Sequence, residues 1–166
     1  MRKILLFTVL SLIFFSCGKS KQTNGFVNDM ENVKIWGSSE SVVKGFAHSG
    51  DFACKLDSST MYSFGMKTLI ENVVKSTPKK VKVKLWVYSV LPNPDATIVI
   101  AVSNNGQSKY WKNSALNGVI KAKEWTETNA IFDLPANLNA KDELSVFVWN
   151  PNKRDVFIDD FDISFE

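Results

Sequence analysis

Apolar and polar residues alternate in short runs from Phe26 onward, and turn-forming residues separate the runs. The clearest run is 81–90, whose alternation is typical of a β-strand with one buried and one exposed face. Residues 97–103 are rich in β-branched side chains and predict a buried strand. A hairpin turn at 104–106 then leads into a strand at 108–111. In run 81–90 the aliphatic residues Val83, Leu85 and Val87 share one face, and Lys82, Lys84, Trp86 and Tyr88 share the other.

The remaining runs predict further strands, about eight or nine in all, so the fold class is all-β, a jelly-roll β-sandwich of two antiparallel sheets. Residues 61–74 are ambiguous, because part of the segment fits helical spacing; we interpret it as a strand with one helical turn. No repeat of 20–50 residues indicates a propeller or a solenoid. The other predicted strands are 26–32, 52–56, 125–134 and the two runs that flank residues 150–153.

The C-terminal stretch predicts a β-hairpin. Two runs rich in β-branched and aromatic residues flank residues 150–153, whose sequence Asn-Pro-Asn-Lys has turn chemistry. The second run carries Asp159 and Asp160 between apolar residues. Alternation gives Asp159 the same side as Phe157 and therefore the core, whereas Asp160 faces outward. A carboxylate buried in this way is costly unless it has partners.

The N-terminus has the pattern of an export signal. Two basic residues precede an apolar run that is far shorter than the roughly 20 residues of a membrane-spanning helix, so residues 1–16 predict a cleaved signal peptide. The junction Phe-Phe-Ser-Cys-Gly resembles a bacterial lipobox, which implies that Cys17 is acylated and begins the mature chain. In the alternative, an ordinary signal peptide, Cys17 is incidental. Two or three acyl chains anchor a protein stably without a transmembrane helix.

Residues 17–25 are polar and predict a short tether, and residues 26–166 predict one β-sandwich domain. Loss of the signal peptide lowers the formal net charge from +3 to +1, so the charge gives no indication of a nucleic-acid partner. Cys54 is left without a disulfide partner and is predicted to fill a small buried position. Together these features predict a lipid-anchored protein of a bacterial cell envelope, periplasmic or surface-exposed.

Four stretches resemble the galactose-binding-domain-like β-sandwiches, the jelly rolls that include many carbohydrate-binding modules. The stretches lie in the family's order and span nearly all of the mature chain. The resemblance implies the fold and is poorly specific for function, because the same sandwich serves many roles. The stretches are Asp29-Met30-Glu31 followed by Trp36, Ala47-His48-Ser49-Gly50 before an alternating strand, Leu85-Trp86-Val87, and Val148-Trp149-Asn150 followed by Ile158-Asp159-Asp160-Phe161.

The resemblance also implies a structural calcium. In many members of the family an acidic residue near the first strand and an Asp of the last strand bind the ion, helped by carbonyls of the turn before the third strand. Calcium takes several hard oxygen ligands and would neutralise an acidic residue among apolar ones. In the alternative, Asp159 caps backbone amides or pairs with a lysine. The implicated residues are Glu31, either Asp159 or Asp160, and the nearby Ser49 and Asp51.

Aromatic side chains mark a first candidate surface for a carbohydrate, because sugar rings stack on flat apolar groups. Trp86 and Tyr88 lie opposite the aliphatic face of their strand, and Phe147 and Trp149 do the same in theirs. If the two strands are neighbours, the four rings line one non-core face. In the alternative, a loop or an N-terminal segment covers these rings and their role is structural.

Tyr110 and Trp111 form a second candidate surface, at a loop tip after the hairpin turn, whereas Trp36 and Trp125 are predicted to plug the ends of the sandwich. We interpret the chain as a membrane-anchored, non-catalytic binding module whose favoured ligand is extended carbohydrate. The alternative is a structural or protein-interaction component of a cell-envelope complex that uses the same face against a protein partner. An open aromatic groove favours the first, and a flat or filled face favours the second.

The sequence offers little for catalysis. Its one histidine, His48, lies in a predicted turn, where a solvated residue is the simpler interpretation, and no Gly-x-Ser-x-Gly elbow supplies a nucleophile. Asp159 and Asp160 point to opposite faces, which is wrong for a glycosidase pair around one bond. No phosphate loop, Cys/His metal cluster or dinucleotide motif is present. The prediction is a protein without enzymatic activity.

Overall fold

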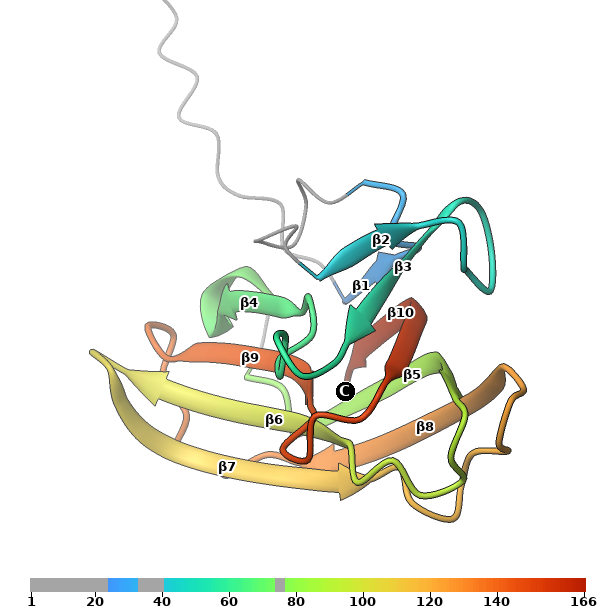
Figure 1. Ribbon diagram of the computed structural model, residues 1–166. Helices are drawn as coiled ribbons and strands as arrows, with labels where there is room; N and C mark the ends of the chain where they lie inside the picture. Colours follow the sequence, from blue (N-terminus) through green and yellow to red (C-terminus); the bar gives the residue numbers. More distant parts are fainter. Residues whose placement is uncertain (1–23, 33–40, 74–76) are drawn as a thin grey trace, which may run out of the picture.

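The structure, a computed structural model, describes residues 24–32, 41–73 and 77–166. Within these residues no helix is long and apolar enough to cross a membrane. The elements of the described part are ten strands and one 3₁₀ turn (Figure 1). They are β1 (Gly25–Asn28), β2 (Val42–Lys44), β3 (Phe52–Leu56), β4 (Met66–Leu69), η2 (Ile70–Asn72), β5 (Lys80–Ser89), β6 (Thr97–Asn104), β7 (Gln107–Ala115), β8 (Thr126–Asp133), β9 (Glu143–Trp149) and β10 (Val156–Phe165).

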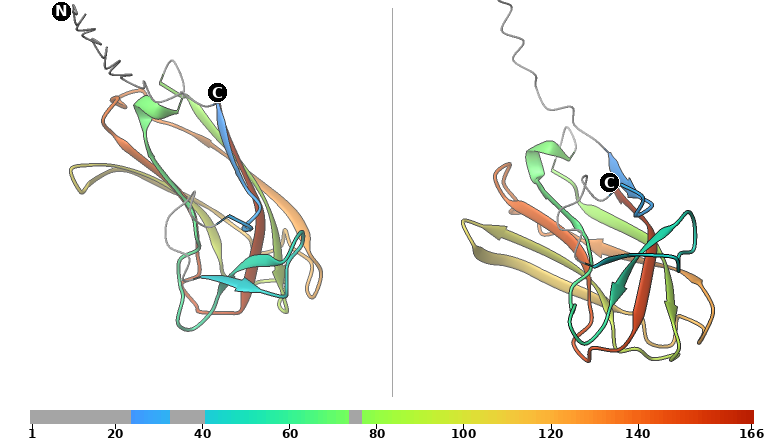
Figure 2. Two further views of the ribbon diagram at one scale, coloured as in Figure 1. Left: turned by 90° about the horizontal axis from the view of Figure 1, so that it is seen from above. Right: turned by 45° about the horizontal axis from the view of Figure 1, so that its top comes forward.

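The strands form two antiparallel sheets that pack as a β-sandwich, which confirms the predicted fold class. Sheet A has the order β2-β3-β10-β5-β8, and β1 pairs with the second half of β10. Sheet B has the order β4-β9-β6-β7. Figure 2 shows the two sheets as two layers. Because most neighbours in each sheet are not consecutive in sequence, the chain crosses repeatedly from one layer to the other.

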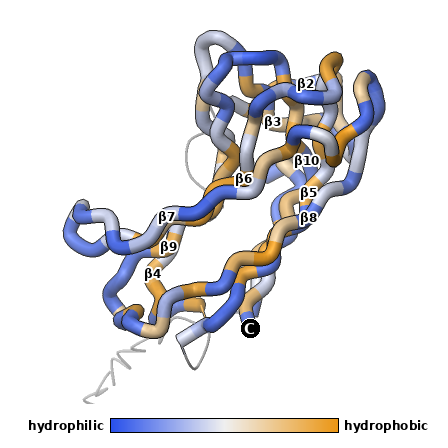
Figure 3. The backbone as a smooth tube through the Cα atoms, turned by 90° about the horizontal axis from the view of Figure 1, so that it is seen from below, coloured by the Kyte–Doolittle hydropathy of each residue, from blue (hydrophilic) through white to orange (hydrophobic). Residues whose placement is uncertain are grey.

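Alternation along the strands places the core between the layers. In β5 the predicted faces are confirmed: Val83 and Leu85 are buried, while Lys84 is exposed on the outer side. Figure 3 shows hydrophobic and hydrophilic residues alternating along strands of both layers. Burial of such apolar surface contributes roughly 25 cal/mol per Å² and is the main term that stabilises the sandwich. From β9 the core receives Leu144, Val146 and Val148, and from β10 it receives Val156, Ile158, Phe161, Ile163 and Phe165.

The predicted C-terminal hairpin is wrong. β9 lies in sheet B and β10 in sheet A, so residues 150–155 carry the chain between layers. The buried Asn150 side chain organises this corner: its amide donates to the Arg154 carbonyl at 2.6 Å, and its oxygen accepts the Arg154 N–H at 3.2 Å. Two consecutive alternating strands have the same residue pattern whether they pair within a sheet or face each other across a core. The pattern alone therefore could not separate the two arrangements.

A β-bulge in β10 changes which side chains are buried. The register with β5 shifts between Asp159 and Asp162, and Asp160 has a φ of 47°. Before the bulge the even-numbered residues are buried, and after it the odd-numbered ones are. Asp160 lies on the outer side, as predicted. The expectation that Asp159 faces the core is wrong: Asp159 pairs with the outward Trp86 and is buried on the outer face of sheet A, under the turn of His48 and Ser49. Phe157 shares this outer face with Asp159, and the bulge turns Phe161 and Ile163, which were expected on the same side as Asp159, to the core instead.

Two smaller predictions are confirmed. The ambiguous segment 61–74 contains the short strand β4 followed by the single turn η2. Cys54 is a free, wholly buried residue of β3 whose thiol donates to the Ser41 hydroxyl at 3.2 Å. Burial raises the pKa of Cys54 to about 11, so the thiol stays protonated and unreactive.

Candidate functional site

The four aromatic residues predicted to share one face lie on opposite faces of the sandwich. Trp86 and Tyr88 belong to β5 in sheet A, whereas Phe147 and Trp149 belong to β9 in sheet B. All four alternate with buried residues and point away from the core. The single four-ring surface is therefore wrong, because it required β5 and β9 to be neighbours. Two separate outer surfaces take its place.

The outer face of sheet B carries an open groove of about 360 Å³. Phe147 and Trp149 contribute two rings from alternate positions of β9, and Trp111 contributes a third ring from β7. Val99 of β6 lies between them, because β6 is the strand between β9 and β7. The fourth ring comes from the segment before β4, which a bridge between Tyr62 and Trp149 holds beside β9. We call this surface the sheet B groove; its lining residues are Tyr62, Val99, Trp111, Phe147 and Trp149.

The rings of the sheet B groove stand at steep angles to one another. The centroids of Trp111 and Trp149 are 6.2 Å apart with planes at 79°, and those of Tyr62 and Phe147 are 5.9 Å apart at 69°. Edge-to-face packing of this kind fixes ring orientation. Tyr62 is 54% exposed and Trp111 47%, so both present ring surface to solvent. None of the lining residues is charged, and the groove suits an uncharged ligand with apolar faces.

Tyr110 and Trp111 lie within β7 and not at a loop tip. Trp111 pairs with Ala101 on the outer side, whereas Tyr110 pairs with Val102, a core residue. The Tyr110 hydroxyl donates to the Asp133 carbonyl at 2.5 Å. Partial burial raises the pKa of Tyr110, and the negative charge of Asp133 adds to the rise. Of the two adjacent aromatic residues, only Trp111 lines the groove.

Tyr62 and Val99 are groove residues that the sequence did not identify. Nothing local to Tyr62 places it beside β9; the placement depends on Ser63, whose N–H donates to the Val148 carbonyl at 2.9 Å and whose hydroxyl accepts the Val148 N–H at 2.8 Å. For Val99 the sequence does contain an indication of its position. This residue lies in the unbroken apolar run 98–102, and such a run indicates a strand that is covered on both faces.

The aromatic residues on the outer face of sheet A are covered by the segment between β2 and β3. His48 stacks on Trp86 with centroids 3.7 Å apart and planes at 12°, and it stays exposed in its turn, as predicted. Phe46 packs on Tyr88 at 4.7 Å. Trp125, predicted to plug an end of the sandwich, joins this cluster 5.7 Å from Phe46. The arrangement supports a structural role for these rings.

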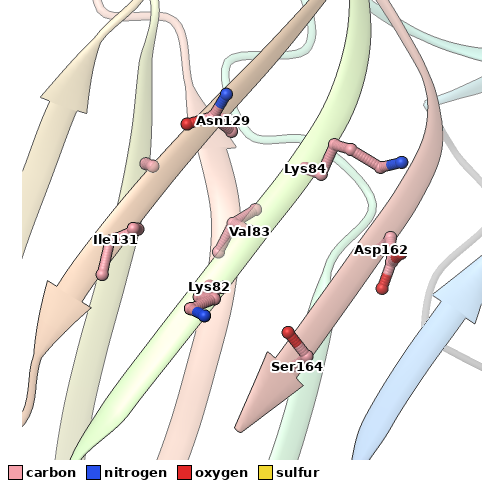
Figure 4. Close-up of a pocket in the computed structure, with 8 residues that line it drawn as sticks. Lys82, Val83, Lys84, Asn129, Ile131, Asp162 and Ser164 are labelled. Carbon is pink, nitrogen blue, oxygen red and sulfur yellow. The ribbon is translucent and has the colours of Figure 1, made fainter. Parts of the chain in front are cut away.

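A second hollow of about 360 Å³ lies on the outer face of sheet A and is lined mostly by polar and charged residues (Figure 4). Its lysines have acidic neighbours: Lys82 pairs with Glu166, and Lys84 lies 3.7 Å from Glu127. Exposed ion pairs of this kind contribute roughly 0–1 kcal/mol and keep the face hydrated. The hollow therefore lacks the stacking surface of the sheet B groove. Figure 4 shows the side chains of Lys82, Lys84, Asn129, Ile131, Asp162 and Ser164 around it.

Asp159 and Asp160 hold the turn before β3. The wholly buried Asp159 accepts the N–H groups of His48 at 2.8 Å and Ser49 at 3.1 Å through Oδ2, and that of Asp160 at 2.8 Å through Oδ1. Burial raises the pKa of Asp159, and these hydrogen bonds oppose the rise. Asp160 accepts the Ser49 hydroxyl at 2.7 Å and lies 2.6 Å from His48 Nδ1. The bulge in β10 thus directs both carboxylates to one turn.

Glu31 holds the other side of this turn. Its Oε1 accepts the N–H groups of Asp51 and Phe52, both at 2.8 Å. Gly50, with a φ of 61°, makes room for that carboxylate, because a Cβ at this position would overlap the Glu31 side chain. The carboxylate of Asp51 pairs instead with Lys44 at 3.5 Å. The residues implicated by the resemblance therefore gather at one turn, with the exception of the Asp51 side chain.

The sequence matches no protein-family model, and no curated protein matches it. Among solved structures, the CBM22-1 xylan-binding domain of Paenibacillus barcinonensis Xyn10C matches with a TM-score of 0.51 at 14% identity, over 89% of this chain and 97% of that domain. The CBM22-1-CBM22-2 tandem of the same protein gives 0.56 at 16% identity over 85% of this chain, which spans 50% of the tandem. A family 16 carbohydrate-binding module gives 0.48 at 15% identity, over 77% and 86% of the two chains.

The chain shares its jelly-roll fold with the CBM22-1 domain and with the CBM22-1-CBM22-2 tandem. In this jelly roll the calcium that the resemblance implies finds no ready site. Among the described residues, no group of three or more His, Cys, Asp or Glu side chains could hold a metal ion. Glu31 Oε1 and both carboxylate oxygens of Asp159 accept N–H groups, whereas Ca²⁺ takes about 6–8 oxygen ligands. As arranged, the residues do not fit calcium and fit the alternative, in which Asp159 caps backbone amides.

Calcium binding by this jelly roll stays a prediction of the resemblance, and calorimetry of EDTA-treated protein tests it. A bound ion predicts a heat of binding and a higher melting temperature, because a ligand at a hundred times its Kd adds about 2.7 kcal/mol to the free energy of unfolding. Glu31→Gln, which keeps the shape of the side chain, is the control and is expected to weaken both signals. Absence of heat and of a melting shift in the wild type would remove the calcium.

Proposed function

We propose that this protein is a non-catalytic binding module that holds an extended, uncharged carbohydrate chain in the sheet B groove. The observation that carries the proposal is the groove itself, which is open, uncharged and lined by four aromatic rings. A face of this kind favours a glycan over a protein partner, which would need a flat or filled surface. The fold shared with a domain named as xylan-binding also supports it.

The chemistry of a pyranose chain fits this surface. The C–H faces of sugar rings stack on aromatic side chains, and the hydroxyl groups need polar partners at the edge of the stack. Asn113 pairs with Val99, and Ser145 with Ala101, so both polar side chains lie on the outer face beside groove residues. A volume of about 360 Å³ is near the lower end of ligand pockets, which suits a short stretch of a longer chain.

Native affinity electrophoresis of the full protein tests the proposal. Xylan or a mixed-linkage β-glucan in the gel is expected to slow its migration. Polygalacturonate is not expected to do so, because no cationic side chain lines the groove to pair with its carboxylates. If no neutral glycan changes the migration, the proposal is wrong and the protein-partner alternative replaces it.

We further propose that the chain is anchored to a membrane through Cys17. Cys17, like Trp36, lies outside the described residues, so the N-terminal sequence is the only basis. Mass spectrometry is expected to find an acylated Cys17 as the first residue of the mature protein. Cys17→Ser is expected to move the protein from the membrane fraction to the soluble fraction; a mature wild-type chain that carries no lipid would contradict the anchor.

A further inference from the structure

The hairpin of β6 and β7 contains a β-bulge two residues before Trp111. Its turn, Asn105–Gly106, has positive φ at both residues, 47° and 78°, and starts a regular ladder. The register then shifts by one: the pair after the shift joins Val102 to Tyr110, and Lys109 is left without a partner on β6. A bulge inserts one residue into one strand and changes the face on which the later side chains lie.

This bulge decides which of two adjacent aromatic residues faces the sheet B groove. With the bulge, Trp111 pairs with Ala101 on the outer face. Without it, the register set by the turn would pair Trp111 with Ile100, a wholly buried residue, and would turn Tyr110 outward. A shift of the β6–β7 register by one residue would therefore direct Tyr110, in place of Trp111, to the groove.

The first residue of the bulge is anchored inward. Lys109 Nζ donates to Asp142 Oδ2 at 2.5 Å and to the Asn137 carbonyl at 3.3 Å. Asp142 is wholly buried and also accepts the Asn104 side chain at 2.7 Å. Burial opposes the charge of Asp142, but its hydrogen bonds, that from Lys109 foremost, hold the pKa of Asp142 below its ordinary value. A carboxylate buried in this way requires its cation, so Lys109 is held at the inner side.

The second residue of the bulge is anchored inward as well. The Tyr110 ring packs against the core, and its hydroxyl reaches across to the Asp133 carbonyl at the end of β8 in sheet A. Lys109 and Tyr110 thus lie on the same side although they are adjacent, which is possible only because the ladder is interrupted between them. The next residue, Trp111, is consequently the one directed outward.

We propose that Lys109 and Tyr110 are positioning residues: by anchoring side by side at the inner face they hold the bulge that presents Trp111 to the sheet B groove. The inference deepens the proposed function, on which its relevance to binding rests. Neither residue lines the groove. Tyr110, which sequence alone placed among the candidate ligand contacts, acts on the ligand only through Trp111.

Tyr110→Ser tests the proposal, because it removes the inward ring and lets the apolar ring of Trp111 take its place. Cross-strand nuclear Overhauser effects of β6 and β7 are expected to pair Trp111 with Ala101 in the wild type and with Ile100 in the variant. Affinity for xylohexaose is expected to fall at least about tenfold, as for loss of an aromatic anchor. Lys112→Ser, the matched control on the same strand, is expected to keep both the wild-type pairing and the affinity.

A second variant returns Trp111 to the outer face without the side chains of Lys109 and Tyr110. Deletion of Lys109 in the Tyr110→Ser protein, with Asp142→Asn to avoid an unpaired buried charge, leaves a regular ladder in which Trp111 again pairs with Ala101. Retention of the Trp111–Ala101 pairing in Tyr110→Ser, or its absence from a folded deletion variant, would overturn the positioning role. If Tyr110→Ser does not fold, the deletion variant decides. Failure of the wild type to bind xylohexaose and every other neutral glycan would overturn the proposed function alone, since the pairing is measured without ligand.

Discussion

Trp111→Ala is expected to weaken binding of xylohexaose about 30-fold, with little change in thermal stability. Trp111 forms one side of the sheet B groove and is 47% exposed on the edge strand β7, so its ring serves a ligand more than the core. Removal of an aromatic anchor from a binding surface costs about 2 kcal/mol or more, and 1.4 kcal/mol corresponds to a factor of ten. Isothermal titration calorimetry measures the affinity, and a thermal melt measures the stability.

Trp86→Ala is the matched control for this prediction. Trp86 lies on the opposite sheet under the stacked ring of His48, so its loss removes packing. The variant is expected to lose about 2 kcal/mol of stability, less than a fully buried tryptophan would, and to keep the wild-type affinity. Equal losses of affinity in the two variants, or an unchanged affinity in Trp111→Ala, would contradict the assignment of the ligand to the sheet B groove.

The second large effect is expected on stability. Asp159→Ala should lower the free energy of unfolding by about 3–5 kcal/mol, because it leaves the part-buried N–H groups of His48, Ser49 and Asp160 without their acceptor. The loss would release the turn before β3 that the two aspartates hold. Urea unfolding in the presence of EDTA measures the effect without any contribution from a cation.

Asp162→Ala provides the comparison, because Asp162 lies three residues farther along the same strand on its outer, polar face. This variant is expected to stay within about 0.5 kcal/mol of the wild type, as surface substitutions usually do. Losses of similar size in both variants would indicate a general effect of charge on β10. A loss below about 1 kcal/mol in Asp159→Ala would show that the amide cap is not an important part of the fold.

Alternation along single strands was predictable from the sequence. The buried and outer faces of β5 and β9 follow from period-two patterning, because one face of each strand must exclude water. The hairpin turn at Asn105–Gly106 was predictable for a different reason, namely the positive φ that both residues tolerate. The burial of Cys54 followed from the same parity. Each of these inferences needs only local residues.

The assignment of strands to sheets was not predictable in this way. β9 and β10 were taken for a hairpin, and the four-ring surface depended on β5 and β9 being neighbours, yet each pair is divided between the two sheets. Residues 150–155 include residues that favour turns, and such residues suit both a hairpin turn within one sheet and a crossing from one sheet to the other. The crossing at residues 150–155 depends on Asn150, whose side chain forms two hydrogen bonds with the Arg154 backbone. The residue pattern does not indicate these hydrogen bonds.

The candidate site was predictable in part for the same reasons. Trp149 and Trp111 were both identified, but from two surfaces that the structure merges into one groove. Tyr110 was placed with Trp111 at a loop tip, whereas both lie within β7, where the bulge at Lys109 turns only Trp111 to the outer face. Tyr62 reaches the groove through long-range pairing with Trp149, which no local pattern encodes.

The most direct test of the central claim, that a glycan binds the outer face of sheet B, is a titration of ¹⁵N-labelled protein with xylohexaose followed by the indole N–H signals. We expect the signals of Trp111 and Trp149 to shift on binding, while those of Trp86 and Trp125, on the covered face of sheet A, stay in place. Shifts confined to Trp86 and Trp125, or the absence of any shift, would contradict the claim.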